Sequence, residues 1–350
     1  MSLRSTLANI LLPITLMAAG TAGAASDPTA PACEPPGIAF GPLCIEPDSR
    51  RLSLQDPTPA DFAALPGLQA LEELWLIGAE AIDWDALQRL PALRVLYLHR
   101  GQPVSLEPIA QLQGLESLRL FGVRVDSLAP LAALPALKEL RLDAAPVADL
   151  APLAELHRLE KLAIIGLDFE RTDLLAGLAR LTLLQLHDTA VTSIAPLHGL
   201  TRLESLRLSE TGVTDLSPLA GMAAMRELEI GSTPVEDIAV LAGMPQLSAL
   251  DLSDTRVHDI TPLAGLDNLG LVLLDRTRVT DVSALTRLVP PGILSLSGLA
   301  LADRTPVLRI EGLSVLGIAG EGIMAEMLAL PEDIRAWAEA APAHDASHQP

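Results

Sequence analysis

A column of carboxylates is the first group in this sequence that could do chemistry. Its members are Asp149, Asp215, Asp237, Asp259 and Asp281, separated by multiples of 22 residues. Carboxylate oxygens are ligands that Ca²⁺ prefers. Each aspartate, however, stands just before a short turn segment, where a side-chain oxygen commonly accepts a backbone N–H. We therefore predict that the column caps turns, with a calcium site as the alternative.

Other residues with catalytic potential lack the spacing that chemistry requires. His99 and His187 fall on strand positions four repeats apart, or about 19 Å at the usual strand spacing, which is too far to share a metal ion. The sequence contains no nucleophile elbow, no metal-ligand pair at helical spacing and no phosphate-binding loop. We expect no enzyme activity, no bound metal and no cofactor.

A 22-residue period organises most of the chain. One frame position occurs thirteen times from Leu52 to Leu316 and holds twelve leucines and one valine, and the position two residues later is always Leu or Ile. Alternate side chains of a strand point to opposite faces, so these two positions face inward on a short strand. About eleven residues then remain for the other side of each coil, which favours a 3₁₀ or irregular turn over a full helix.

The repeat frame resembles the short leucine-rich repeat of bacterial internalin-like proteins. It can be written L-x-x-L-x-L-x-x-T-x-V-x-D-L-x-P-L-A-x-L, and it covers about residues 51–318. The resemblance implies an α/β solenoid, a bent rod or horseshoe with a parallel sheet on its concave face. Internalins usually carry Asn where this chain has Thr189, Thr211, Thr233, Thr255 and Thr277. A threonine hydroxyl can also bond the backbone of an adjoining coil.

Outward strand positions form the concave face in this architecture, and binding residues are sought there. Aromatic residues are only 2% of the chain, yet three of them fall on successive strands of this face. Large rings and arginines dominate interface energetics. The predicted binding surface comprises Trp75, Ile77, Tyr97, His99, Arg119, Phe121 and Arg141, continued by Arg207, Glu229 and Asp251. The alternative is that the N-terminal cap covers the rings.

The chain ends predict export. Residues 1–25 have Arg4, a short apolar run and a small-residue stretch, as in a secretory signal peptide. An uncleaved anchor is the alternative, although the apolar run is shorter than a membrane span requires. Residues 26–50 form an N-terminal cap in which Cys33 and Cys44 are expected to form a disulfide rather than a zinc site. The array occupies 51–319, a helical cap 320–340 and a disordered tail 341–350.

Composition restricts the partners. The formal net charge of −20 argues against nucleic acid and anionic membranes. We expect a monomeric, periplasmic or secreted scaffold that binds a protein. Recognition of a glycan or small ligand by Trp75 and Tyr97 is the alternative, because an aromatic platform also suits sugar stacking.

Two further expectations concern single coils. The coil that starts at Leu162 is irregular, with Leu167, Arg171 and Leu174 at the Thr, Asp and Pro positions of the frame, and it is interpreted as a bend or as a central contact patch. In the regular coil at 206, Leu206 is expected to be essential to the fold and Arg207 to be dispensable.

Overall fold

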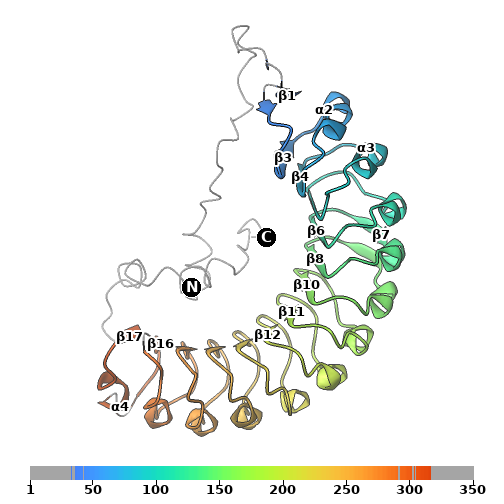
Figure 1. Cartoon of the computed structure of the whole chain (residues 1–350). Coiled ribbons are helices and arrows are strands. Elements are labelled where there is room, and N and C mark those ends of the chain that lie inside the picture. The colour runs from blue at the N-terminus through green and yellow to red at the C-terminus, as the bar shows by residue number, and fades with distance from the viewer. Residues whose placement is uncertain are drawn as a thin grey trace, which may run out of the picture.

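The computed structural model describes residues 33–316, apart from residues 34, 35, 42, 291, 302 and 304. The chain winds into a curved solenoid whose strands lie on the inner side of the arc and whose helices lie on the outer side (Figure 1). The predicted concave parallel sheet is confirmed, with 13 strands in sequence order. They are β3 (Arg51–Gln55), β4 (Glu73–Ile77), β5 (Val95–His99), β6 (Ser117–Phe121), β8 (Glu139–Asp143), β10 (Lys161–Ile165), β11 (Leu183–Gln185), β12 (Ser205–Arg207), β13 (Glu227–Glu229), β14 (Ala249–Asp251), β15 (Leu271–Leu273), β16 (Gly292–Ser295) and β17 (Leu313–Leu316).

The strand register follows the leucine frame. Leu206 lies opposite Leu184 on one side and Leu228 on the other, and the same 22-residue step relates the strands from β3 to β16. Leu206 is fully buried, as are most of its counterparts. Because each coil buries these leucines against two neighbours, the array is stabilised by stacking rather than by any one coil.

The last coil departs from the period. Asp281 still bridges Asp303, 22 residues on, but Leu294 pairs with Val315 and not with the predicted Leu316. One residue is therefore missing between Asp303 and Val315, in the span that contains α4 (Thr305–Leu308) in place of a 3₁₀ turn.

Short turns on the convex side agree with the prediction in most coils. The 3₁₀ helices are η1 (Leu65–Gly67), η2 (Glu107–Gln111), η3 (Ala129–Ala133), η4 (Ala151–Glu155), η5 (Thr172–Leu175), η6 (Ala195–Gly199), η7 (Ser217–Leu219), η8 (Ala239–Gly243), η9 (Thr261–Leu263) and η10 (Ser283–Leu285). Two early coils instead carry the α-helices α2 (Pro59–Ala64) and α3 (Trp84–Gln88). Thr58 and Asp61 form a capping box at the start of α2, which continues directly into η1, and Asp83 caps α3.

The carboxylate column caps the turns, as the sequence predicts. Asp215 accepts the N–H of Ser217 at 2.8 Å, and the same contact joins Asp259 to Thr261. The pKa of Asp215 is lowered by the N–H and then the hydroxyl of Ser217, and the pKa of Asp259 is lowered by the hydroxyl and then the N–H of Thr261. The other members of the column, Asp149, Asp237 and Asp281, make equivalent contacts at 2.8–3.1 Å. Within the described residues no cluster of His, Cys, Asp and Glu could hold a metal ion.

The threonine column binds its own coil, which corrects the expectation of a bond to an adjoining coil. Thr211 donates its hydroxyl proton to the carbonyl oxygen of Leu208 at 2.6 Å, three residues earlier. Thr233 does the same to Ile230 at 2.6 Å. The turn after the strand brings the hydroxyl back onto its own strand, so the buried carbonyl is satisfied within the coil. The remaining members are Thr189, Thr255 and Thr277.

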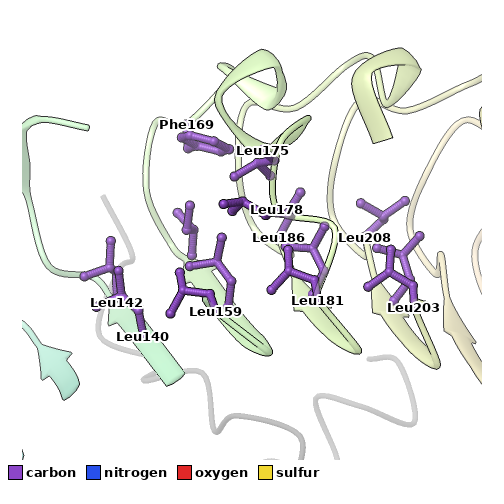
Figure 2. Close-up of a cluster of buried hydrophobic side chains, with 14 of the residues drawn as sticks. Leu140, Leu142, Leu159, Phe169, Leu175, Leu178, Leu181, Leu186, Leu203 and Leu208 are labelled. Carbon is purple, nitrogen blue, oxygen red and sulfur yellow. The ribbon is translucent and has the colours of Figure 1, made fainter. Parts of the chain in front are cut away.

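The irregular coil has a larger side chain than its neighbour at one core position and a smaller side chain at another. Phe169, only 1% exposed, occupies the position that holds Val191 one coil later, while Thr172 occupies that of Ile194. Figure 2 shows the Phe169 ring beside Leu175, above the strand leucines. The Thr172 hydroxyl donates to the Ser193 carbonyl oxygen at 2.9 Å. Both substituted positions therefore remain buried, with the Thr172 hydroxyl satisfied by a hydrogen bond.

The N-terminal cap contains an antiparallel hairpin of β1 (Ile38–Phe40) and β2 (Leu43–Ile45). The predicted disulfide between Cys33 and Cys44 is present, with the Cα atoms 5.2 Å apart. The hairpin packs against α2, and Phe40 joins the core with 2% exposure. The predicted signal peptide at 1–25, helical cap at 320–340 and tail at 341–350 lie outside the described residues.

A small parallel sheet on the outer part of the coils was not anticipated. It joins β7 (Val125–Ser127) to β9 (Val147–Asp149). The prediction treated the whole convex side as turns, because the valine of the frame was considered only as a core residue. Val125 is buried, whereas Asp126 points to solvent.

A left-handed backbone position follows each strand of the 13-stranded sheet from β3 to β16. Twelve residues at the 22-residue period have positive φ, and four of them, Gly78, Gly122, Gly166 and Gly298, are glycine. The others are Asp56, Arg100, Ala144, Asp188, Glu210, Ser232, Asp254 and Arg276. A side chain with a Cβ atom is strained in this region, and alanine has no polar group to compensate.

Replacing Ala144 with glycine is therefore expected to stabilise the protein. Ala144 is exposed and has φ 43°, so the substitution relieves strain without removing core contacts. After allowing for the greater freedom of glycine in the unfolded chain, we expect a gain of about 0.5–1 kcal/mol in urea unfolding. Ala148→Gly, at an exposed position without positive φ, is the control and should lose stability. Equal losses in both variants would contradict the strain argument.

Candidate binding surface

Four rings form a continuous row on the concave face, which we call the aromatic ladder: Trp75, Tyr97, His99 and Phe121. Parallel pairing sets Trp75 opposite Tyr97 and His99 opposite Phe121. The Trp75 and Tyr97 ring centroids are 4.6 Å apart, those of Tyr97 and His99 5.9 Å, and those of His99 and Phe121 4.6 Å. The tilted and edge-to-face arrangements are the favourable ones for aromatic pairs. The structure thus brings together the aromatic residues that the sequence singles out.

The rings of the aromatic ladder are partly exposed and uncharged near neutral pH. All four side chains are half-buried, and so is the predicted neighbour Ile77. Burial, with a smaller contribution from Arg100, holds the pKa of His99 below its ordinary value. Burial and nearby Asp143 raise the pKa of Tyr97 above its ordinary value. A partner therefore meets a neutral apolar row at pH 7.

Carboxylates hold the predicted arginines in place. Arg119 Nε lies 2.9 Å from Glu139 Oε1, and Arg141 Nε lies 2.6 Å from Asp143 Oδ2. Arg141 also donates to the Gln185 side chain at 3.3 Å. A cation that is already oriented loses less side-chain freedom on binding, but its charge is partly neutralised. The basic character of the first half of the concave face is therefore weaker than its arginines alone suggest.

The polar end of Trp75 is also engaged. Its indole N–H donates to Glu73 Oε1 at 2.7 Å, and Glu73 lies 3.0 Å from Arg51. The sequence interpretation missed Glu73, Glu139 and Asp143 as supporting residues. Their positions in the sequence could have indicated this role. Each lies on the same face of the sheet as the predicted binding residues, either two residues away along the strand or opposite such a residue in the next strand.

The other predicted binding residues lie on the same face but are buried. Arg207, Glu229 and Asp251 occupy successive strands and are 4%, 5% and 1% exposed. Arg207 Nε lies 3.2 Å from Glu229 Oε1. These three side chains offer little contact area, so the accessible part of the predicted surface is the aromatic ladder together with Ile77, Arg119 and Arg141.

The described part of the N-terminal cap packs next to the first coils. Ile38 of β1 lies close to Gly67 of η1, where a Cβ atom would come within 2.6 Å of the Ile38 Cδ1 atom. This contact lies beside α2, on the helical side of the coil, whereas the rings project from the strands. The rings keep partial exposure with the hairpin in this position.

Comparison with models of known protein families gives no match, and no curated protein matches the chain either. Solved structures do match. The internalin InlF of Listeria monocytogenes is 24% identical, with 78% of this chain and 89% of that chain covered and a TM-score of 0.65. TLR13 in its complex with ssRNA13 is 16% identical, with coverage of 72% and 44% and a TM-score of 0.55. The internalin InlC2 of Listeria monocytogenes is 30% identical, with coverage of 55% and 84% and a TM-score of 0.49.

The 13-stranded sheet, the short convex turns and the likeness to InlF define a leucine-rich repeat solenoid. With its 22-residue period, the chain is a leucine-rich repeat protein whose fold is similar to that of the internalin InlF. Among the described residues, none of the helices has the length and apolar character needed to cross a membrane.

Proposed function

We propose that the protein is a non-catalytic, exported scaffold that binds a partner protein through the aromatic ladder. The observation that carries the proposal is the row of four half-buried rings, with centroids 4.6–5.9 Å apart, in a chain with 2% aromatic residues. Such rings provide large contact area at low entropic cost. Two arginines lie next to the row. Arg119 is opposite Tyr97 in the next strand, and Arg141 is opposite Arg119 in the strand after that.

Export and a monomeric state belong to the same proposal. The apolar N-terminal run followed by small residues supports a signal peptide, and the Cys33–Cys44 disulfide fits the periplasm or the extracellular space. The charge of −20 supports a protein partner over nucleic acid or an anionic membrane.

Truncation of two ladder rings tests the proposal. Purified residues 26–350 are used to capture partners from envelope and secreted fractions, and the Kd of the captured protein is then compared with that of Trp75→Ala/Tyr97→Ala. Removing two central rings of an interface costs on the order of 2 kcal/mol or more, so we expect binding at least about 30-fold weaker. Because the rings are only half-buried, the melting temperature should fall by no more than a few degrees.

A matched control removes exposed apolar side chains elsewhere. Val289→Ala/Leu308→Ala truncates residues that are 41% and 59% exposed near the opposite end of the array, and it should leave the Kd unchanged. Unchanged binding in Trp75→Ala/Tyr97→Ala would refute the proposal. A large drop in its melting temperature would instead support a role of the rings in packing against the cap.

A glycan is the second candidate ligand for the same surface. Neutral rings beside pre-oriented side chains, such as the Arg119–Glu139 pair, suit sugar stacking with lateral hydrogen bonds. Binding to a glycan array that is lost in Trp75→Ala/Tyr97→Ala, with no protein captured, would favour this candidate over a protein partner.

A further inference from the structure

A groove opens on the rim of the array, where the loops that follow β3, β4 and β5 lead to the convex side. Its larger part has a volume of about 550 Å³ and lies between residues 56–62 and 78–83. A smaller part of about 110 Å³ continues to residues 102–105. The two parts share Glu80, Ala81 and Ile82, and we call them together the rim groove. The larger part alone is within the roughly 300–1,000 Å³ typical of ligand pockets.

The lining of the rim groove combines an apolar base with carboxylates. Phe62 is buried and Ile82 is partly buried against the core, and Pro57 and Pro59 add further apolar surface. Exposed carboxylates come from Asp56 and Glu80. Asp83 adds a third, which also accepts the N–H of Ala86 at 3.0 Å.

Charge at the rim groove is of one sign. Among the described residues, no lysine or arginine lines either part of the groove. Carboxylates beside a low-dielectric apolar wall attract cations more strongly than they do in open water, and they repel anionic ligands. The apolar base is best covered by an aliphatic or aromatic side chain.

We propose that the rim groove binds a cationic segment of a partner protein, in which lysine or arginine flanks an apolar side chain. The apolar side chain packs on Ile82, Pro57 and Pro59, above the buried Phe62, while the cation lies against Asp56 and Glu80. A free metal ion is a poorer occupant, because the described residues contain no group of three or more ligands placed to hold one.

This site differs from the aromatic ladder and does not depend on it. The ladder lies on the strands, whereas the groove begins after β3 and β4 end, at Asp56 and Gly78. His99 is the last residue of β5, so the two surfaces meet along one edge of the sheet. A partner that covers the ladder can extend over this edge into the groove.

Direct binding of a model peptide tests the proposal. The probe is fluorescein-labelled Arg-Leu-Arg-Leu-Arg, with Gln-Leu-Gln-Leu-Gln as the uncharged comparison, measured by fluorescence polarisation on the full chain. In Asp56→Asn/Glu80→Gln we expect the Kd for the cationic peptide to rise about five- to tenfold. Asparagine keeps the left-handed backbone at position 56, where φ is 46°. Ala81→Arg places a cation at an exposed lining position and should weaken binding similarly.

A charge-matched variant separates the groove from the general field of the protein. Asp126→Asn/Glu155→Gln removes two exposed carboxylates outside the groove and should change the Kd less than about twofold. If this variant weakens binding as much as the groove variants do, the peptide responds only to the net charge and the proposal fails. Unchanged binding in Asp56→Asn/Glu80→Gln and Ala81→Arg would also overturn it. Loss of peptide binding in Trp75→Ala/Tyr97→Ala alone would assign the peptide to the ladder and reject the groove.

Discussion

Leu206→Asp is expected to unfold the array. Leu206 is fully buried in β12, with Leu184 and Leu228 opposite it in the two neighbouring strands. Removing the aliphatic group costs about 2–5 kcal/mol, and an unpaired carboxylate in the core adds several more. Because domains are stable by only about 5–15 kcal/mol, little or no stability remains. Circular dichroism should show a melting transition at least 10 °C lower or absent.

The control for this prediction introduces the same charge four residues earlier. Arg202 is exposed, so Arg202→Asp should change the free energy of unfolding by no more than about 0.5 kcal/mol. Arg207, which the sequence suggested was dispensable, is unsuitable, because aspartate there would join Glu229 in a buried position. If Leu206→Asp proved as harmless as Arg202→Asp, the inward assignment of the leucine frame would be wrong.

Removal of one complete coil should leave a folded protein. Deleting residues 227–248 makes β14 the neighbour of β12, with Leu250 opposite Leu206 and Asp251 in the place of Glu229 beside Arg207. Each coil contacts mainly its neighbours, so a shorter array is still complete. The unfolding enthalpy should fall by roughly one thirteenth, because one of 13 strands is lost.

Removal of half a coil should have the opposite result. Deleting residues 227–237 takes out eleven residues, so the turn segment at 239–243 enters the position of a strand. The leucines then fall out of register with their neighbours, and we expect aggregation or a loss of the cooperative transition. Size-exclusion chromatography and calorimetry distinguish the two deletions. Similar behaviour of the two proteins would show that the 22-residue register does not determine the fold.

The regular features of the fold could be predicted because they repeat. The inward leucines and the capping aspartates recur at a fixed interval, so each coil confirms the position assigned in the others. Features specific to one or two coils could not be recognised in this way. The capping box of Thr58 and Asp61 is an example, since its signal is local and lies outside the repeat frame.

Side-chain partners could be predicted less well than positions. Arg119 was correctly placed on the concave face, but its ion pair with Glu139 depends on where a long side chain turns. The threonine hydroxyls were correctly expected to bond the backbone, but of the wrong coil, because the path of the turn decides which carbonyl is nearest. The rim groove also depends on that path, since its lining comes from three separate loops.

The threonine hydrogen bonds have a consequence for how such an array changes over evolutionary time. Thr211 and Thr233 each donate a hydrogen bond to a carbonyl oxygen of their own coil. A gene duplication or recombination that adds or removes a whole coil therefore leaves no buried carbonyl oxygen without a donor at either junction. The bond is repeated in five consecutive coils, from Thr189 to Thr277, whereas the same frame position holds no hydroxyl residue in the coils before them. Length variation among descendants of this gene should therefore concentrate in that segment, while the coils that carry the aromatic row stay constant in number.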